Sequence, residues 1–150
     1  MPKSHRKKNQ EKYLLVDGYN IIFAWEELNI LAKDNLEAAR GKLQDILCNY
    51  QGYTGVHLIL VFDAYRVKGN PGTVTKYHNI HVIYTKEAET ADMFIEKTTK
   101  EIAQKHQVVV ATSDALEQMI IMGHGAIRLS ANGFWDEIER VNALIQEELG

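Results

Sequence analysis

Short runs of apolar residues alternate along the chain with longer segments in which apolar residues recur every three or four positions. The short runs have the length of strands, and their continuous hydrophobicity is typical of strands covered on both faces of a parallel sheet. The longer segments have the spacing of amphipathic helices. The pattern predicts strands at residues 12–17, 56–62, 81–85, 108–112 and 127–129. It predicts helices at residues 21–25, 36–51, 91–103, 115–122 and 131–149.

Several helix ends carry recognisable signals. Asp34, with Glu37 three residues later, resembles a capping box and predicts the start of the long second helix there. That helix is expected to stop at Gly52 or Gly55, since glycine readily ends helices. Ser130 is a suitable cap for the last helix.

The order of these elements predicts an α/β fold. Right-handed crossovers between parallel strands place helices on both faces of a sheet, so we expect a three-layer α/β/α sandwich with a mostly parallel sheet of four to five strands. A chain of 150 residues with 45% apolar content has room for one domain with a real core. Residues 64–79 contain glycine and proline and are predicted to form a long mobile connection.

The ends of the predicted strands carry acidic residues. Four aspartates stand where a strand, or the helix after it, meets a loop: Asp17, Asp63, Asp92 and Asp114. The carboxyl ends of parallel strands share one edge of the sheet, so these side chains are expected to meet there. Clustered carboxylates repel one another unless a cation neutralises them, which predicts a Mg²⁺ or Mn²⁺ site. Such a cation can activate a water for in-line attack at phosphorus.

Two of the four aspartates also have a simpler interpretation. Asp92 lies in a first helical turn, where the helix dipole favours an anion, and Asp114 after Ser113 is placed to cap a helix. Taken singly, these structural roles are favoured. The occurrence of four aspartates at corresponding positions favours the metal site instead.

Three polar neighbours extend this candidate site. Glu89 precedes Asp92 by one helical turn and can join the metal ligands. Asn20, three residues after Asp17, can orient a water or a phosphate oxygen, or it can cap the following helix. Ser113 can hydrogen-bond the carboxylates or a phosphate, although hydroxyls in turns commonly bond only the backbone.

Basic and aromatic residues occur in two places. Within residues 64–79, Arg66, Lys68, Lys76 and Tyr77 form a mixture suited to phosphate contacts and to base stacking on single-stranded RNA, although a solvated loop carries such residues by default. Residues 1–12 hold five basic residues and one glutamate, whereas the whole chain has a net charge of −3. We therefore expect a basic flexible arm at 1–12 before a domain at 13–150. The arm either contacts nucleic acid or serves as a solubilising tail.

Other patterns exclude function classes. No apolar run approaches the ~18 residues of a membrane span, and no signal-peptide pattern follows the basic start, so a cytoplasmic protein without membrane association is expected. The single cysteine, Cys48, excludes an internal disulfide. No glycine-rich nucleotide-binding signature is present, which disfavours a nucleotide cofactor.

Four strings resemble, in the correct order, motifs of the YacP-like NYN family of PIN-like ribonucleases, over residues 13 to about 140. They are Leu-Val-Asp-Gly-Tyr-Asn at 15–20, Val-Phe-Asp-Ala at 61–64, Thr-Lys-Glu-Ala-Glu-Thr-Ala-Asp at 85–92 and Ala-Thr-Ser-Asp at 111–114. The resemblance implies a PIN-like fold and a metal-dependent endoribonuclease. It implies acidic metal ligands at Asp17, Asp63, Asp92 and Asp114. Similarity to the ribosome-associated bacterial branch implies mRNA on the translating ribosome as substrate.

The expected roles follow from the residues and the resemblance together. The predicted catalytic residues are Asp17, Asp92, Asp114 and Asp63. The predicted metal ligands are Asp17, Asp92, Asp114 and Glu89. The predicted RNA-binding residues are Asn20, Ser113, Arg66, Lys68, Lys76 and Tyr77. The alternative function is a non-catalytic RNA- or ribosome-binding module of the same fold. A small-molecule phosphohydrolase is disfavoured because no second aspartate stands two residues after Asp17.

Overall fold

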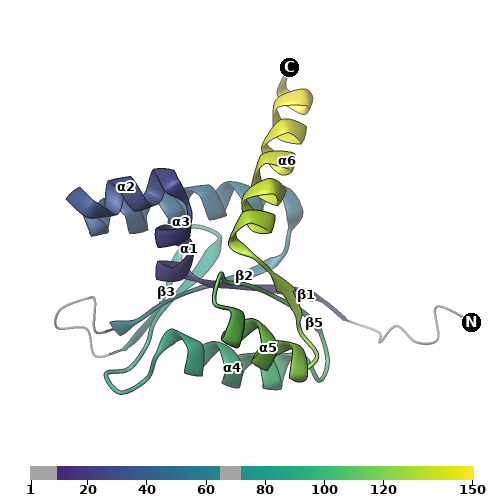
Figure 1. Cartoon of the computed structure of the whole chain (residues 1–150). Helices are drawn as coiled ribbons and strands as arrows, with labels where there is room; N and C mark the ends of the chain where they lie inside the picture. Colours follow the sequence, from purple (N-terminus) through teal and green to yellow (C-terminus); the bar gives the residue numbers. More distant parts are fainter. Residues whose placement is uncertain (1–9, 65–71) are drawn as a thin grey trace, which may run out of the picture.

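A six-stranded sheet with helices on both faces runs through residues 10–64 and 72–150, the part of the chain that the computed structural model describes (Figure 1). The strand order is β3-β4-β2-β1-β5-β6. The strands are β1 (Lys12–Asp17), β2 (His57–Phe62), β3 (Thr73–Tyr77), β4 (Ile80–Tyr84), β5 (Gln107–Ala111) and β6 (Ile127–Leu129). All neighbouring strands in this sheet pair in parallel except β3 with β4. The five predicted strands are therefore confirmed to within one residue at each end, and the fold class with them.

Strand β3 corrects the prediction for residues 64–79. Thr73–Tyr77 is not a mobile connection, because it pairs antiparallel with β4 from Thr73 opposite Tyr84 to Tyr77 opposite Ile80. A two-residue turn at His78 and Asn79 joins the two strands, and His78 adopts a positive φ of 52°. An edge strand has little apolar surface to bury, and β3 is largely exposed, so it lacks the hydrophobic run that marks the central strands.

Six helices lie within the described residues, four on one face of the sheet and two on the other. Helices α1 (Gly18–Ala24), α2 (Glu26–Asp34), α3 (Leu36–Thr54) and α6 (Ala131–Leu149) cover the face drawn uppermost in Figure 1. Helices α4 (Ala91–Ile102) and α5 (Ala115–Gly123) cover the opposite face. None of these helices has both the length and the apolar composition that a bilayer crossing requires.

The prediction that Asp34 caps the long helix α3 was wrong, because Asp34 belongs to helix α2. Asp34 is the last residue of α2 and does not cap α3; the cap is Asn35, whose Oδ1 accepts from Ala38 N at 3.0 Å. Helix α2 was missed because it buries little, Leu28 being its one fully buried residue. The predicted stop at Gly55 is confirmed, with a left-handed φ of 72°. The predicted cap at Ser130 is confirmed by its bond from Gly133 N at 3.0 Å.

Two hydrophobic clusters hold the three layers together. Leu14 and Val16 of β1 join the cluster beneath α1, α3 and α6, whereas Leu15 joins the cluster against α4 and α5. Alternate residues of a strand point to opposite faces, so the continuously apolar β1 is buried on both sides. This burial fixes the central strand, and with it the position of Asp17 at its end.

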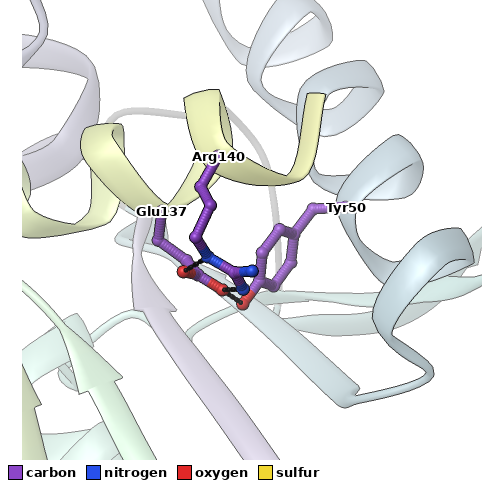
Figure 2. A network of polar contacts seen from close by, with 3 residues as sticks. All are labelled: Tyr50, Glu137 and Arg140. Atoms are coloured by element: carbon purple, nitrogen blue, oxygen red, sulfur yellow. Dashed lines mark hydrogen bonds and ion pairs between the residues drawn. The ribbon is translucent and has the colours of Figure 1, made fainter. Parts of the chain in front are cut away.

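A polar network joins the two long helices on one face (Figure 2). The Tyr50 hydroxyl of α3 donates to Glu137 Oε2 of α6 at 2.9 Å. Arg140 donates to the same carboxylate from Nε and Nη2, each at 2.9 Å, which holds the pKa of Glu137 below its usual value. The Glu137 carboxylate therefore fixes the register of α6 against α3.

Candidate metal centre

Three carboxylates from three different elements converge at one edge of the sheet. Asp17 ends β1, Asp92 lies in the first turn of α4, and Glu117 lies in the first turn of α5. Within the described residues, one oxygen of each lies within 4.8 Å of the others, and this is the one such group of acidic, histidine or cysteine ligands. Asp17 and Glu117 are buried, with 6% and 5% of their surface exposed, whereas Asp92 is open to solvent.

Close packing at the end of β1 positions Asp17. Gly18 lies so near Phe62 that a Cβ on it would stand 2.3 Å from the Phe62 ring. The Tyr19 ring packs on the same phenylalanine at a centroid distance of 4.9 Å. The chain can therefore turn directly from strand into α1 after Asp17, and glycine is the residue that this turn requires.

The start of α4 is held by two side chains. Asp63, which follows β2, accepts the backbone N–H of Ala91. Thr90 caps the helix by accepting from Met93 N at 3.1 Å. Because Asp92 lies in this first turn, both contacts determine where its carboxylate stands. Asp63 thus sits beside the centre and positions it through the backbone.

Helix α5 places Glu117 in a comparable way. Asp114 caps α5 with Oδ1, which accepts from Leu116 N at 2.9 Å and from Glu117 N at 3.1 Å. The Thr112 hydroxyl donates to Glu117 Oε2 at 2.9 Å, and Thr112 O accepts from Gln118 Nε2 at 2.6 Å. The hydrogen bond from Thr112 therefore fixes one oxygen of Glu117, Oε2. Its other oxygen, Oε1, is buried and has no hydrogen-bond partner among residues 10–64 and 72–150.

Asn20 and Ser113 connect the two sides of the centre. Asn20 Oδ1 accepts from both the backbone N–H and the hydroxyl of Ser113, the latter at 2.6 Å. This contact ties the start of α1 to the loop before α5. The structure thus brings these two predicted RNA-binding residues together at the site edge.

The electrostatics of the centre favour a cation. Burial, reinforced by the charges of Asp92 and Asp63, raises the pKa of Asp17 to about 7, although the neighbouring Glu117 side chain lowers it in part. Burial and then the charge of Asp17 raise the pKa of Glu117 to about 10. The protein alone therefore resists ionising both groups. A divalent cation would remove this repulsion and would give the unpaired Glu117 Oε1 a partner, so the residues present fit an oxygen-ligated Mg²⁺ or Mn²⁺.

The remaining predicted residues occupy other positions. Glu89 forms an ion pair with Lys97 at 3.1 Å and lies outside the group of three carboxylates, as does Asp114. Lys76 and Tyr77 lie on β3 opposite the amino-terminal end of β4, and the Tyr77 hydroxyl donates to Asp45 at 2.8 Å. They are therefore at the edge of the sheet away from the acidic centre.

Two further predicted RNA contacts, Arg66 and Lys68, lie outside the described residues. Glu117 is the functional candidate that the sequence reasoning missed. A signal for it was present, because Asp114 and Glu117 have the spacing of a capping box. A glutamate in a first helical turn is usually exposed, whereas this one is turned inward.

The sequence of this chain matches one known protein family over most of its length. The family model for the YacP-like NYN domain matches residues 14–150. The chain belongs to the YacP-like NYN family. A member of this family from Bacillus subtilis (strain 168), the uncharacterized protein YacP, is 44% identical over 137 residues, which cover 91% of this chain and 80% of that protein.

Solved structures of the Bacillus subtilis relative have the same fold as this chain. Crystal structures of Rae1 (YacP) from Bacillus subtilis match with a TM-score of 0.78. The W164L mutant is 41% identical, with 92% of this chain and 80% of that chain covered; the other structure is 43% identical, with 91% and 79% covered. The six-stranded sheet flanked by helices is thus the fold of this family, and the PIN-like prediction is confirmed. Membership of the NYN family together with the acidic cluster indicates a nuclease.

The first prediction concerns stability, pH and metal. The pKa of Asp17 rises from an ordinary value of 3.8 to about 7 in the folded protein, so the stability that this group contributes is present below pH 3.8 and is lost as the pH rises through 7. Mn²⁺ should reverse this loss, and thermal denaturation should show a gain of several degrees at pH 8 but little at pH 5.5. Asp17→Asn should abolish the gain and raise the melting temperature of the metal-free protein.

Asp34→Asn, at an exposed helix end, is the matched control and should respond to Mn²⁺ as the wild type does. An equal Mn²⁺ gain in Asp17→Asn would contradict the assignment of the centre.

The second prediction concerns the turn after β1. Gly18→Ala should lower the free energy of unfolding by about 1–3 kcal/mol, because the new methyl group overlaps the Phe62 ring. Gly41→Ala is the control: its Cβ meets nothing within 4 Å inside α3, so it should stabilise by about 0.5–1 kcal/mol. Urea denaturation measures both. Equal effects of the two substitutions would show that the close approach at Gly18 is not required.

Proposed function

We propose that this protein is a divalent-metal-dependent endoribonuclease that cleaves single-stranded RNA. The observation that carries the proposal is the convergence of Asp17, Asp92 and Glu117 at the carboxyl edge of the sheet in a member of the NYN family. Two of the three are buried, and none of them forms an ion pair with a residue in 10–64 or 72–150, an arrangement that costs stability and is typical of a functional site.

In this proposal the metal ligands are Asp17, Asp92 and Glu117. All three offer carboxylate oxygens, which Mg²⁺ and Mn²⁺ prefer. When bound, the cation would supply charge neutralisation at a phosphate and a water acidic enough to act as nucleophile. Asp63 and Asp114 act as positioning residues and not as metal ligands, because their oxygens hold the starts of α4 and α5.

The chain's own groups would orient the RNA. Helices α4 and α5 both begin at the centre, so their amino-terminal ends favour a phosphate there. The exposed Ser113 hydroxyl, held by Asn20, stands at the same edge. Lys86 follows β4 at the carboxyl edge and is exposed, so it can offset part of the repulsion between the acidic centre and RNA.

We infer that the substrate is mRNA associated with the translating ribosome. This step rests on the resemblance of the four sequence motifs to the ribosome-associated branch of the family and on 44% identity to YacP. RNA is then the principal partner and the ribosome a second one.

Cleavage of a labelled single-stranded RNA in Mn²⁺ tests the chemistry. Asp17→Asn and Glu117→Gln should each lower the cleavage rate by at least about 100-fold, since each removes a charged ligand. RNA binding measured by fluorescence anisotropy should be retained. Asp34→Asn should cleave normally. Cleavage by Glu117→Gln at the wild-type rate would contradict the proposed set of metal ligands. If the wild-type protein binds RNA but does not cleave it, the non-catalytic RNA-binding module is favoured instead.

The substrate inference has a separate test. The same mRNA is offered naked and in a translating ribosome complex, and cleavage products are mapped by primer extension. We expect specific cuts in the ribosome-bound mRNA that are absent with Asp17→Asn. Equal cutting of naked and ribosome-bound mRNA at the same sites would refute the ribosome requirement and leave the endoribonuclease intact.

A further inference from the structure

A second site candidate lies away from the metal centre, where α1 meets α2 beside the first turn of α6. A cavity of about 650 Å³ opens there. The residues that define its character are Trp25, Trp135, Glu26, Glu27, Ile30 and Asn132. These helices cover the face of the sheet opposite α4 and α5, so the cavity does not belong to the acidic centre.

The aromatic wall of this cavity is held by packing and by a hydrogen bond. Trp25 is 3% exposed, and its indole Nε1 donates to Ala131 O at 2.9 Å. The Trp135 ring packs edge-on to Trp25 at a centroid distance of 5.1 Å and an interplanar angle of 75°. Trp135 lines the cavity and remains partly exposed, so part of its indole is accessible to a ligand. A fixed aromatic surface binds a ligand without the cost of ordering a flexible side chain.

The charge at the opening is negative. Glu26 and Glu27 are the charged residues of the lining, and no lysine, arginine or histidine of the described chain lines the cavity. Glu27 forms an ion pair with Lys42, whereas Glu26 has no hydrogen bond or ion pair with any described residue. The dipole of α2 accounts for acidic residues in its first turn. It does not account for a tryptophan-walled cavity beside them.

We propose that this cavity binds an arginine or lysine side chain of a basic polypeptide partner. Tryptophan is the aromatic residue that attracts cations most strongly, and the nearby carboxylates add charge attraction. Ile30, 56% exposed, can cover the apolar stem of such a side chain. The same carboxylates repel a phosphate backbone, so the chemistry favours a basic peptide over RNA. The proposal is independent of the nuclease activity.

Intrinsic fluorescence provides a direct readout, because Trp25 and Trp135 are the only tryptophans in the chain and both line the cavity. A hexa-arginine peptide titrated into the full-length protein at low salt should quench or shift this fluorescence with saturation. Hexa-citrulline, of similar shape but uncharged, should not. The double variant Glu26→Gln, Glu27→Gln should bind hexa-arginine about ten-fold more weakly.

The matched control is Glu139→Gln, Glu147→Gln, which changes the net charge equally at exposed positions of α6. It should bind as the wild type does, and an equal loss in both double variants would overturn the proposal by showing general charge attraction. A saturable response to oligouridylate in EDTA with none to hexa-arginine would also overturn it, as would no response to either probe. Circular dichroism confirms that each variant is folded.

Discussion

The repulsion between the buried carboxylates of Asp17 and Glu117 is the constraint on which this structure depends. Each is almost fully removed from water, burial raises the pKa of both, and the charge of Asp17 raises the pKa of Glu117 further. Two such groups are expensive to hold together in the absence of a cation. Both side chains are held at this edge because β1 is buried on both faces and α5 is capped by Asp114.

The contacts around the three carboxylates hold the elements that carry them. Backbone N–H groups at the starts of two helices donate to Asp63, Thr90 and Asp114. These bonds fix the first turns of α4 and α5, and so the positions of the Asp92 and Glu117 carboxylates. Asn20 and Ser113 then lock α1 to the loop before α5. The resulting centre has one exposed carboxylate, Asp92, and two buried ones, Asp17 and Glu117. A substrate would therefore approach from the Asp92 side, where the first turns of α4 and α5 are also exposed to anions.

The parts of the fold and of the site that could be predicted from the sequence are those marked by continuous apolar runs and by polar residues after them. The central strands and the three-layer order follow from the apolar runs, and the meeting of Asp17 with Asp92 follows from their positions after parallel strands. Strand β3 was missed because an edge strand buries too little to leave a hydrophobic run, and helix α2 because it has a single buried residue. Glu117 was missed for a different reason. Its capping-box spacing is a local signal, whereas its inward orientation results from contacts with Thr112, which only the folded chain brings into place.

The central claim is that Asp17, Asp92 and Glu117 form one cation site. Anomalous diffraction from a crystal of the protein soaked in Mn²⁺ tests it most directly, because the scattering locates the metal without reference to activity. We expect a single dominant peak at coordination distance from one oxygen of each of the three carboxylates. A peak between Asp114 and Glu89, with Glu117 uncoordinated, would contradict it, as would the absence of any peak at this edge of the sheet.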